Sequence, residues 1–511
     1  MLTTNPIFDA KADSDVRQIT YGFRAAFDKT YDDNITFFTL DTSVLDGPDI
    51  LQPMDNEVIQ AWDKYEYTDY TKDIISLEYT REEDFPSSVV EAIATIRLEN
   101  TDGFYTPGGG SAIGPYILPK RPIRLLTGFS GQNLPQFNGI TDKMPKVDYV
   151  DKTAEFNARD FLSYVFDQEL GSDVILENQR TDQILDYIFQ LAGLLPAQYV
   201  LDHANNTIPF TYFESSELIG NICRTLVEAE LGRLFMDELG VIRFYTSDRI
   251  NDTPVYTLDA SKIINIVHSQ DDKIINLVDV TSEVREVQSN QLVYELSTSQ
   301  DNPIIVKAGE TAEYFFNFED PVTNIDTIDS YIFNANSDGS GADLTVYVNI
   351  TNVYLFAKAV KITFDNTGTN NAYLTAMQVY GTPALVVRTI RYTASDNDSI
   401  ADFGVVKYEI DNGYVQTNEN AEAIAETIVN YYGTYGSVIE VQTKGNPALQ
   451  IGDCIYVDLD NYTGNYNIIK TVDIYDDGSY TQRLTMRKAR TANWFIIDTS
   501  VLDGTDVLDI R

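Results

Sequence analysis

The stretch Ala92-Ile93-Ala94-Thr95-Ile96-Arg97-Leu98 decides the fold class of this chain. Apolar residues occupy every second position, which predicts a half-buried β-strand, and the following Asn100-Thr101-Asp102-Gly103 predicts a turn. Similar runs occur on both sides, at residues 74–79, 122–129, 136–140 and 147–157. The chain also contains 33 Tyr and 25 Phe, residues that favour strands. We therefore expect a mainly β protein.

Other segments depart from this pattern. Between residues 160 and 250, Thr181 is expected to cap one helix and Ser215 a second helix, whose apolar face includes Cys223. A turn at Gly240 is expected to lead into a strand of alternating apolar and polar residues. This segment therefore predicts a small α/β domain inserted between β segments. Residues 305–385 alternate again and predict a β-sandwich. A helix is expected from about Asn418, and the strands around it suggest a barrel.

Length and charge limit the function. At 511 residues the chain is too long for one core, so several domains are expected. The formal net charge of −42 repels phosphate backbones, which argues against a nucleic-acid binder that relies on basic patches. Solubility explains the charge more simply than an acidic functional surface. No secretory signal, membrane span or disulfide framework is expected, and production in a reducing cytoplasm fits.

Catalytic and metal-binding patterns are missing from the sequence. The two histidines, His203 and His268, lack the partners of a general base, and no Cys or His pair has zinc-ligand spacing. The glycines at 108–110 and 114 lack the lysine of a phosphate-binding loop. We expect no catalytic residues, no metal site and no cofactor, and therefore no enzyme.

One short sequence occurs twice near the two ends of the chain. Asp-Thr-Ser-Val-Leu-Asp-Gly stands at residues 41–47 and again at 498–504. The copies are either equivalent edge strands of one fold or docking segments for equivalent surfaces on a partner. The candidate docking residues are Asp41, Leu45, Asp46 and Gly47 in the first copy, and Asp498, Leu502, Asp503 and Gly504 in the second.

Three further stretches form a recognisable series. The first begins with Ile96-Arg97-Leu98-Glu99-Asn100-Thr101-Asp102-Gly103-Phe104-Tyr105-Thr106-Pro107 and continues through 118–124 to Phe137-Asn138-Gly139-Ile140-Thr141-Asp142. The second is Glu228-Ala229-Glu230-Leu231-Gly232-Arg233-Leu234-Phe235, followed by 240–244, and the third is Gln450-Ile451-Gly452-Asp453, followed by 462–466. Together they resemble the tail hub, or baseplate hub, proteins of tailed bacteriophages and related tail-like machines.

The resemblance implies a trimer rich in β-barrels, with an inserted α/β domain, that forms a ring closing the six-fold tail tube. Three chains with two repeat copies each would supply six docking elements. The implied partners are two further copies of the chain, a distal tail or tail tube protein ring, the tape measure protein, and tail fibre or tip proteins. DNA would pass through the lumen without sequence-specific binding, and the protein would lie at the tail tip of the virion after synthesis in the host cytoplasm.

The resemblance also orders the domains along the chain. The expected segments are N-terminal strands with the first repeat (1–60), the first part of the hub β-barrel (61–160), the inserted α/β domain (161–255), a second barrel segment (256–304), the β-sandwich insertion (305–385), a hub β-barrel with a helix (386–490) and the second repeat (491–511).

Two other functions stay open. The sandwich at 305–385 would grip a glycan if this were a receptor- or carbohydrate-binding tail-tip protein, and exposed aromatic side chains on one of its faces would favour that interpretation. A cell-wall hydrolase is the third possibility, although neither a lysozyme nor a peptidase segment is visible in the sequence.

Overall fold

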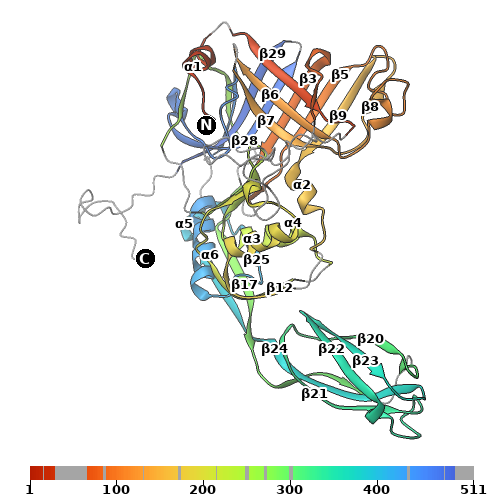
Figure 1. Cartoon of the computed structure of the whole chain (residues 1–511). Coiled ribbons are helices and arrows are strands. Elements are labelled where there is room, and N and C mark those ends of the chain that lie inside the picture. Colours follow the sequence, from red (N-terminus) through yellow and green to blue (C-terminus); the bar gives the residue numbers. More distant parts are fainter. Residues whose placement is uncertain are drawn as a thin grey trace, which may run out of the picture.

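The computed structural model describes residues 1–14, 17–28, 66–83, 88–129, 132–170, 174–213, 216–247, 253–269, 273–297, 303–433, 438–476 and 478–489. Figure 1 shows three parts one above another: a large curved sheet at the top, an α/β part in the middle and a β-sandwich at the bottom. The fold is therefore mainly β and multidomain, with a small α/β domain inserted, as the sequence predicts.

Both ends of the described chain build the largest sheet, which has fourteen strands with the main order β16-β26-β29-β28-β3-β5-β9-β7-β6-β1-β2. Its N-terminal strands are β1 (Ile19–Ala25), β2 (Thr68–Asp69), β3 (Ile74–Glu82), β5 (Ile93–Glu99), β6 (Pro122–Phe129), β7 (Gln132–Thr141), β8 (Lys146–Asp148) and β9 (Thr153–Asp160). Two strands come from the middle of the chain, β15 (Tyr256–Asp259) and β16 (Ile263–His268). Its C-terminal strands are β26 (Val438–Thr443), β27 (Cys454–Asp458), β28 (Gly464–Asp476) and β29 (Ser479–Lys488).

The alternation in the sequence explains this sheet. In β5, Ala94, Ile96 and Leu98 are buried, while the residues between them are more exposed. Strands β3 and β28 pair antiparallel and so join the N-terminal and C-terminal halves. The closed barrels predicted from the sequence are not confirmed, because the described strands form an open path whose end strands, β16 and β2, do not pair.

A short helix precedes the first strand. Helix α1 (Pro6–Ala12) begins after Asn5, whose side chain accepts a hydrogen bond from the Phe8 amide, and Pro6 occupies the first helical position. From the sequence, strands were expected within residues 1–60 and no helix was assigned here, because this capping signal was not weighed. Phe8 packs on Phe129 with the ring centroids 5.0 Å apart, which fixes α1 on the sheet.

The inserted α/β domain lies below the large sheet (Figure 1). Its elements are α2 (Phe161–Phe166), β10 (Val174–Arg180), α3 (Thr181–Leu191), β11 (Tyr199–Leu201), β12 (Thr207–Phe213), α4 (Ile219–Glu228), β13 (Arg233–Met236) and β14 (Ile242–Tyr245). Strand β4 (Ser88–Val90) pairs with β13 in parallel. Cys223 is fully buried in the core of this domain, as its place in the apolar stripe predicts.

The two predicted helix caps differ from those observed. Helix α3 begins at Thr181 itself with Arg180 at the cap position, because the Thr181 hydroxyl donates to Glu230 Oε2 at 3.1 Å. Helix α4 begins at Ile219 with Leu218 at its cap position, and Ser215 lies outside the described residues.

A second sheet, with six strands, runs through the lower half of the molecule. Strand β24 (Ala372–Ser395) pairs with β17 (Leu277–Val287), which also pairs with β25 (Lys407–Asp411). Helices α5 (Asn397–Phe403) and α6 (Asn418–Tyr432) belong to this part. The predicted helix from Asn418 is confirmed, and its buried face consists of Ala421, Ile424, Ala425, Ile428, Val429 and Tyr432.

The other end of β24 enters the β-sandwich, where it pairs with β18 (Gln291–Leu296), β19 (Ile304–Val306) and β21 (Val322–Asn334). A three-stranded sheet faces it, with the order β20 (Thr311–Asn317), β23 (Ala359–Asn366) and β22 (Val348–Phe356). Side chains of both sheets form one core. Strand β22 begins directly after a 3₁₀ turn, η4 (Thr345–Tyr347).

Candidate functional site

The repeat residues lie outside the described part of the chain. Docking by Asp41, Leu45, Asp46, Gly47, Asp498, Leu502, Asp503 and Gly504 therefore stays a prediction from the sequence.

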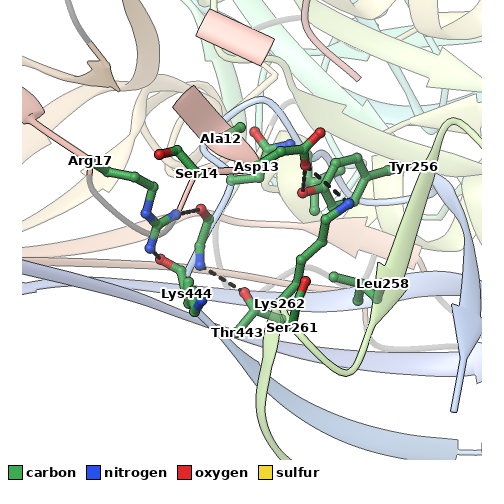
Figure 2. Close-up of a pocket in the computed structure, with 13 residues that line it drawn as sticks. Ala12, Asp13, Ser14, Arg17, Tyr256, Leu258, Ser261, Lys262, Thr443 and Lys444 are labelled. Atoms are coloured by element: carbon green, nitrogen blue, oxygen red, sulfur yellow. Dashed lines mark hydrogen bonds and ion pairs between the residues drawn. The ribbon is translucent and has the colours of Figure 1, made fainter. Parts of the chain in front are cut away.

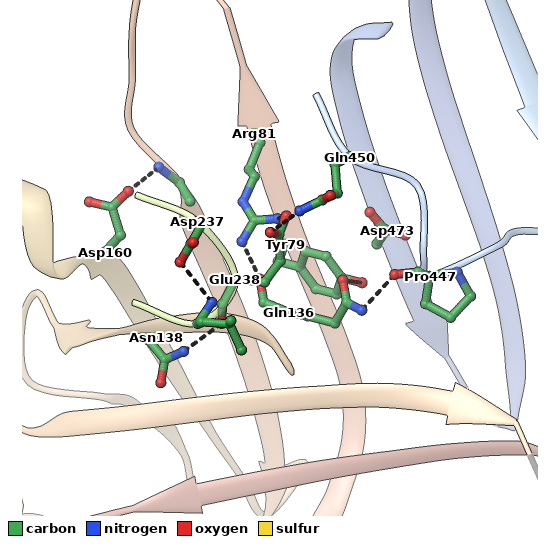
Figure 3. A network of polar contacts seen from close by, with 12 residues as sticks. Tyr79, Arg81, Gln136, Asn138, Asp160, Asp237, Glu238, Pro447, Gln450 and Asp473 are labelled. Carbon is green, nitrogen blue, oxygen red and sulfur yellow. Dashed lines mark hydrogen bonds and ion pairs between the residues drawn. The ribbon is translucent and has the colours of Figure 1, made fainter. Parts of the chain in front are cut away.

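The described residues contain a buried polar cluster at the junction of the large sheet and the α/β domain (Figure 3). We call it the polar junction and define it as Tyr79, Arg81, Gln136, Asn138, Glu238, Gln450 and Asp473. Arg81 is 7% exposed and Glu238 is 4% exposed. Such groups are stable in the interior only when they are paired and hydrogen-bonded.

Glu238 is the centre of the polar junction. One carboxylate oxygen pairs with the Arg81 guanidinium, and the other accepts from the Gln450 side-chain amide. The Glu238 backbone carbonyl accepts from Asn138 Nδ2 at 2.7 Å. Arg81 also donates to the Gln136 backbone carbonyl. One residue of the α/β domain thus contacts both halves of the large sheet.

Local structure places Glu238 in this position. It lies in the turn between β13 and β14, where Asp237 Oδ1 accepts from the Val241 amide at 2.8 Å. Asp237 Oδ2 also accepts from Arg243 Nε at 2.7 Å. Gly240 has φ +83°, a conformation that suits glycine and closes the turn. The turn is therefore rigid enough to present a carboxylate to the sheet.

Asp473 forms the other side of the polar junction. Burial raises the pKa of its carboxyl to about 6, although hydrogen bonds from Tyr480 and Gln482 and the charge of Arg81 oppose this. Tyr480 Oη donates to Asp473 Oδ1 at 2.5 Å, and Gln482 Nε2 donates to the same oxygen at 2.9 Å. The junction thus contains a carboxyl whose protonation changes in mildly acidic solution.

A second polar site holds the N-terminal segment on the C-terminal strands (Figure 2). Asp13 Oδ1 accepts from Tyr256 Oη at 3.0 Å and lies 3.0 Å from Lys262 Nζ. Arg17 donates to the backbone carbonyls of Lys444 and Gly445. These groups line a small pocket and bond to one another, so the arrangement stabilises the attachment of this segment.

The structure also shows where the two histidines and Cys223 lie. His203 and His268 are both exposed, and the His268 ring lies 5.0 Å from the Tyr462 ring. Burial raises the pKa of the Cys223 thiol, which keeps it protonated and unreactive. Among the described residues, no group of three His, Cys, Asp or Glu side chains is placed to hold a metal ion. None of the helices in the described ranges is long and apolar enough to cross a membrane.

Sequence reasoning missed the polar junction, although β3 contained a signal. The buried face of this strand carries Leu77, Tyr79 and Arg81 in alternation. A charged residue at a core position of an alternating strand requires a buried partner. The sequence does not reveal that this partner is Glu238, which lies 157 positions away.

Comparison by sequence finds no matching protein family and no similar curated protein. Comparison with solved structures finds several similar ones. One is a 43 kDa tail protein of prophage MuSo2 from Shewanella oneidensis, with 12% sequence identity and a TM-score of 0.45. The match covers 83% of this chain and 96% of that chain. A tail protein from Neisseria meningitidis MC58 has 9% identity, coverage of 83% and 94%, and a TM-score of 0.44.

Prophage tail protein gp18 from Listeria monocytogenes EGD-e has 8% identity, coverage of 83% and 91%, and a TM-score of 0.40. All three solved structures are tail proteins, and two of them come from prophages.

Proposed function

We propose that this chain is a structural hub protein of a phage-type tail, located at the tail tip of the virion. In this role it closes the tail tube as a homotrimeric ring, anchors tail-tip or fibre proteins, and contacts the distal tail or tube ring and the tape measure protein. It works by fit between surfaces and catalyses no reaction.

One observation supports this proposal: residues that lie in or next to the three stretches that resemble hub proteins meet at the polar junction. Asn138 belongs to the first stretch, Glu238 lies between the two parts of the second, and Gln450 begins the third. Both Asn138 and Gln450 donate hydrogen bonds to Glu238. The polar junction therefore joins three segments that are far apart in sequence and that lie in or beside these motifs.

The charge of the chain supports the second part of the proposal, passage of DNA through the ring. A trimer carries three times the chain's formal charge of −42. An acidic lumen repels phosphate groups, so DNA passes without adsorbing. Substitution of acidic lumen residues by lysine should then slow DNA ejection, and an unchanged ejection rate would argue against this part.

Imaging of the purified protein tests the ring directly. Three chains of 57.5 kDa give an assembly of about 170 kDa. Oligomers of identical chains usually have closed symmetry, so a trimer should form a three-fold ring. Negative-stain class averages should show a three-fold ring, and mass photometry should give the same mass. A protein that stays at the mass of one chain over a range of concentrations would refute the proposed trimer.

Binding of a glycan by the sandwich is the second candidate function. It is favoured by exposed aromatic side chains on the sheet β20-β23-β22.

A further inference from the structure

The outward face of the three-stranded sheet β20-β23-β22 carries aromatic side chains in solvent. Phe315 is 62% exposed and Tyr354 is 53% exposed. In the strand register, Phe315 lies opposite Lys361, and Lys361 lies opposite Tyr354. The Phe356 ring, also on this face, has its centroid 5.8 Å from that of Phe315. We define the aromatic face as Glu313, Phe315, Tyr354, Phe356 and Lys361.

The aromatic face is not needed to cover the core of the sandwich. The other face of the same sheet supplies the buried side chains Phe316, Ile362 and Phe364, which pack against the sheet that contains β24. Strands alternate between faces, so Phe315 and Tyr354 point away from this core. Large aromatic side chains that stand together in solvent are typical of a binding surface.

Polar groups lie between the rings. Lys361 Nζ is 5.0 Å from the centroid of the Tyr354 ring and 3.2 Å from Glu313 Oε2. The face therefore alternates ring surfaces with one cationic donor and one anionic acceptor. A surface that buries itself against another apolar protein surface would have to remove both charges from water, which costs several kcal/mol per ion by order of magnitude.

This alternation matches the chemistry of a sugar ring. The C–H bonds on one side of a pyranose carry a slight positive charge and lie well against the negative face of an aromatic ring. Its hydroxyl groups both donate and accept hydrogen bonds, so they can pair with Glu313 and Lys361 at the edge of the stacked ring.

The negative charge of the sandwich favours a neutral glycan over an anionic one. Residues 303–383 contain nine Asp or Glu and three Lys, a net charge of −6 in a chain of −42. Like charges repel, which disfavours binding of sulfated, phosphorylated or uronate-rich chains. A neutral saccharide meets no such repulsion.

We propose that the aromatic face binds a neutral glycan, with Phe315 and Tyr354 stacking on sugar rings and Lys361 and Glu313 bonding to hydroxyl groups. This site is separate from the polar junction, and it does not depend on the proposed hub function.

The test uses the full-length protein on an array of neutral hexose and N-acetylhexosamine oligomers. Sulfated, phosphorylated and uronate chains of equal length serve as the comparison. We expect retention on at least one neutral glycan, and at least a tenfold loss of affinity in the Phe315→Ala/Tyr354→Ala variant. Tyr347 is 49% exposed in η4, outside the sheet, so Tyr347→Ala is the matched control and should bind within twofold of the parent.

A second measurement avoids mutation. The retained glycan, added in soluble form to the unmodified protein, should slow hydrogen exchange in β20 and β22 and leave α6 unchanged. The proposal is overturned if no neutral glycan is retained, if anionic chains bind better, or if the double variant binds like the parent. It is also overturned if that variant changes the mass of the purified assembly, because the face would then be a contact between copies.

Discussion

Replacement of Glu238 by alanine should destabilise the contact between the α/β domain and the large sheet. The change leaves the Arg81 guanidinium, 7% exposed, without its carboxylate and leaves the Gln450 amide without its acceptor. Removal of one partner of a buried ion pair costs about 3–5 kcal/mol, since the remaining charge stays out of water. We expect a loss of this size in the free energy of opening the polar junction.

Hydrogen exchange in β3 and in the β13–β14 turn is the appropriate assay, because a multidomain chain does not unfold in a single two-state step. The matched control is Glu82→Gln, one residue from Arg81 on the same strand. Glu82 forms an exposed pair with Lys470 at 2.7 Å, and such pairs contribute about 0–1 kcal/mol.

A double-mutant cycle separates the ion pair from simple loss of packing. Arg81→Met and Glu238→Leu should each be strongly destabilising, while the combined variant should cost at least about 2 kcal/mol less than their sum, because no unpaired charge remains. Additive effects, or a Glu238→Ala effect as small as that of Glu82→Gln, would refute the reasoning.

Four further predictions follow from other sites. Burial raises the Asp473 pKa from 3.8 to about 6, so the native state holds an extra proton between these values and loses stability as pH rises through them. Asp473→Asn should remove about 2 kcal/mol of this loss, measured by hydrogen exchange in β28 at pH 4 and 7 and corrected for the intrinsic exchange rate. Gly139→Ala should lower the free energy of opening at β7 by about 3 kcal/mol, measured by hydrogen exchange, since its Cβ would lie 2.2 Å from a backbone oxygen. Cys223 should resist alkylation until the α/β domain unfolds. Deletion of residues 491–511 should abolish tail assembly if the second repeat is a docking segment.

Each of these predictions has a result that would contradict it. Equal pH dependence of the parent and Asp473→Asn would show that this carboxyl is not perturbed. Gly110→Ala is the control for Gly139, since nothing lies within 4 Å of its added Cβ, and equal effects of the two would refute the steric argument. Rapid native-state labelling of Cys223 would mean that the core opens readily. Normal assembly after deletion would leave the repeat as an ordinary strand.

The local sequence pattern predicted individual strands and helices better than it predicted how the strands pair. Alternation located β5 and spacing located α6, because a period of two or 3.6 is a property of the segment itself. Helix α1 was missed, although Asn5 and Pro6 form an N-terminal signal. Barrel closure could not be settled, because it depends on which strands pair across hundreds of residues.

The candidate sites were also hard to predict from the sequence, because they depend on contacts between distant segments. On sequence grounds, exposed aromatic side chains on one face of the sandwich would favour glycan binding, but the sequence did not identify Phe315 and Tyr354. Their exposure depends on the register of β20, β23 and β22. The Glu238–Arg81 pair was equally hidden, since the two residues come from different domains.

Strand β24 has a mechanical consequence. Its 24 residues span about 80 Å at roughly 3.3 Å per residue, and they pair with strands of the sandwich at one end and with β17 at the other. Because β24 belongs to both parts, a displacement of the sandwich is passed along this one strand into the middle of the molecule, where helix α6 packs on it.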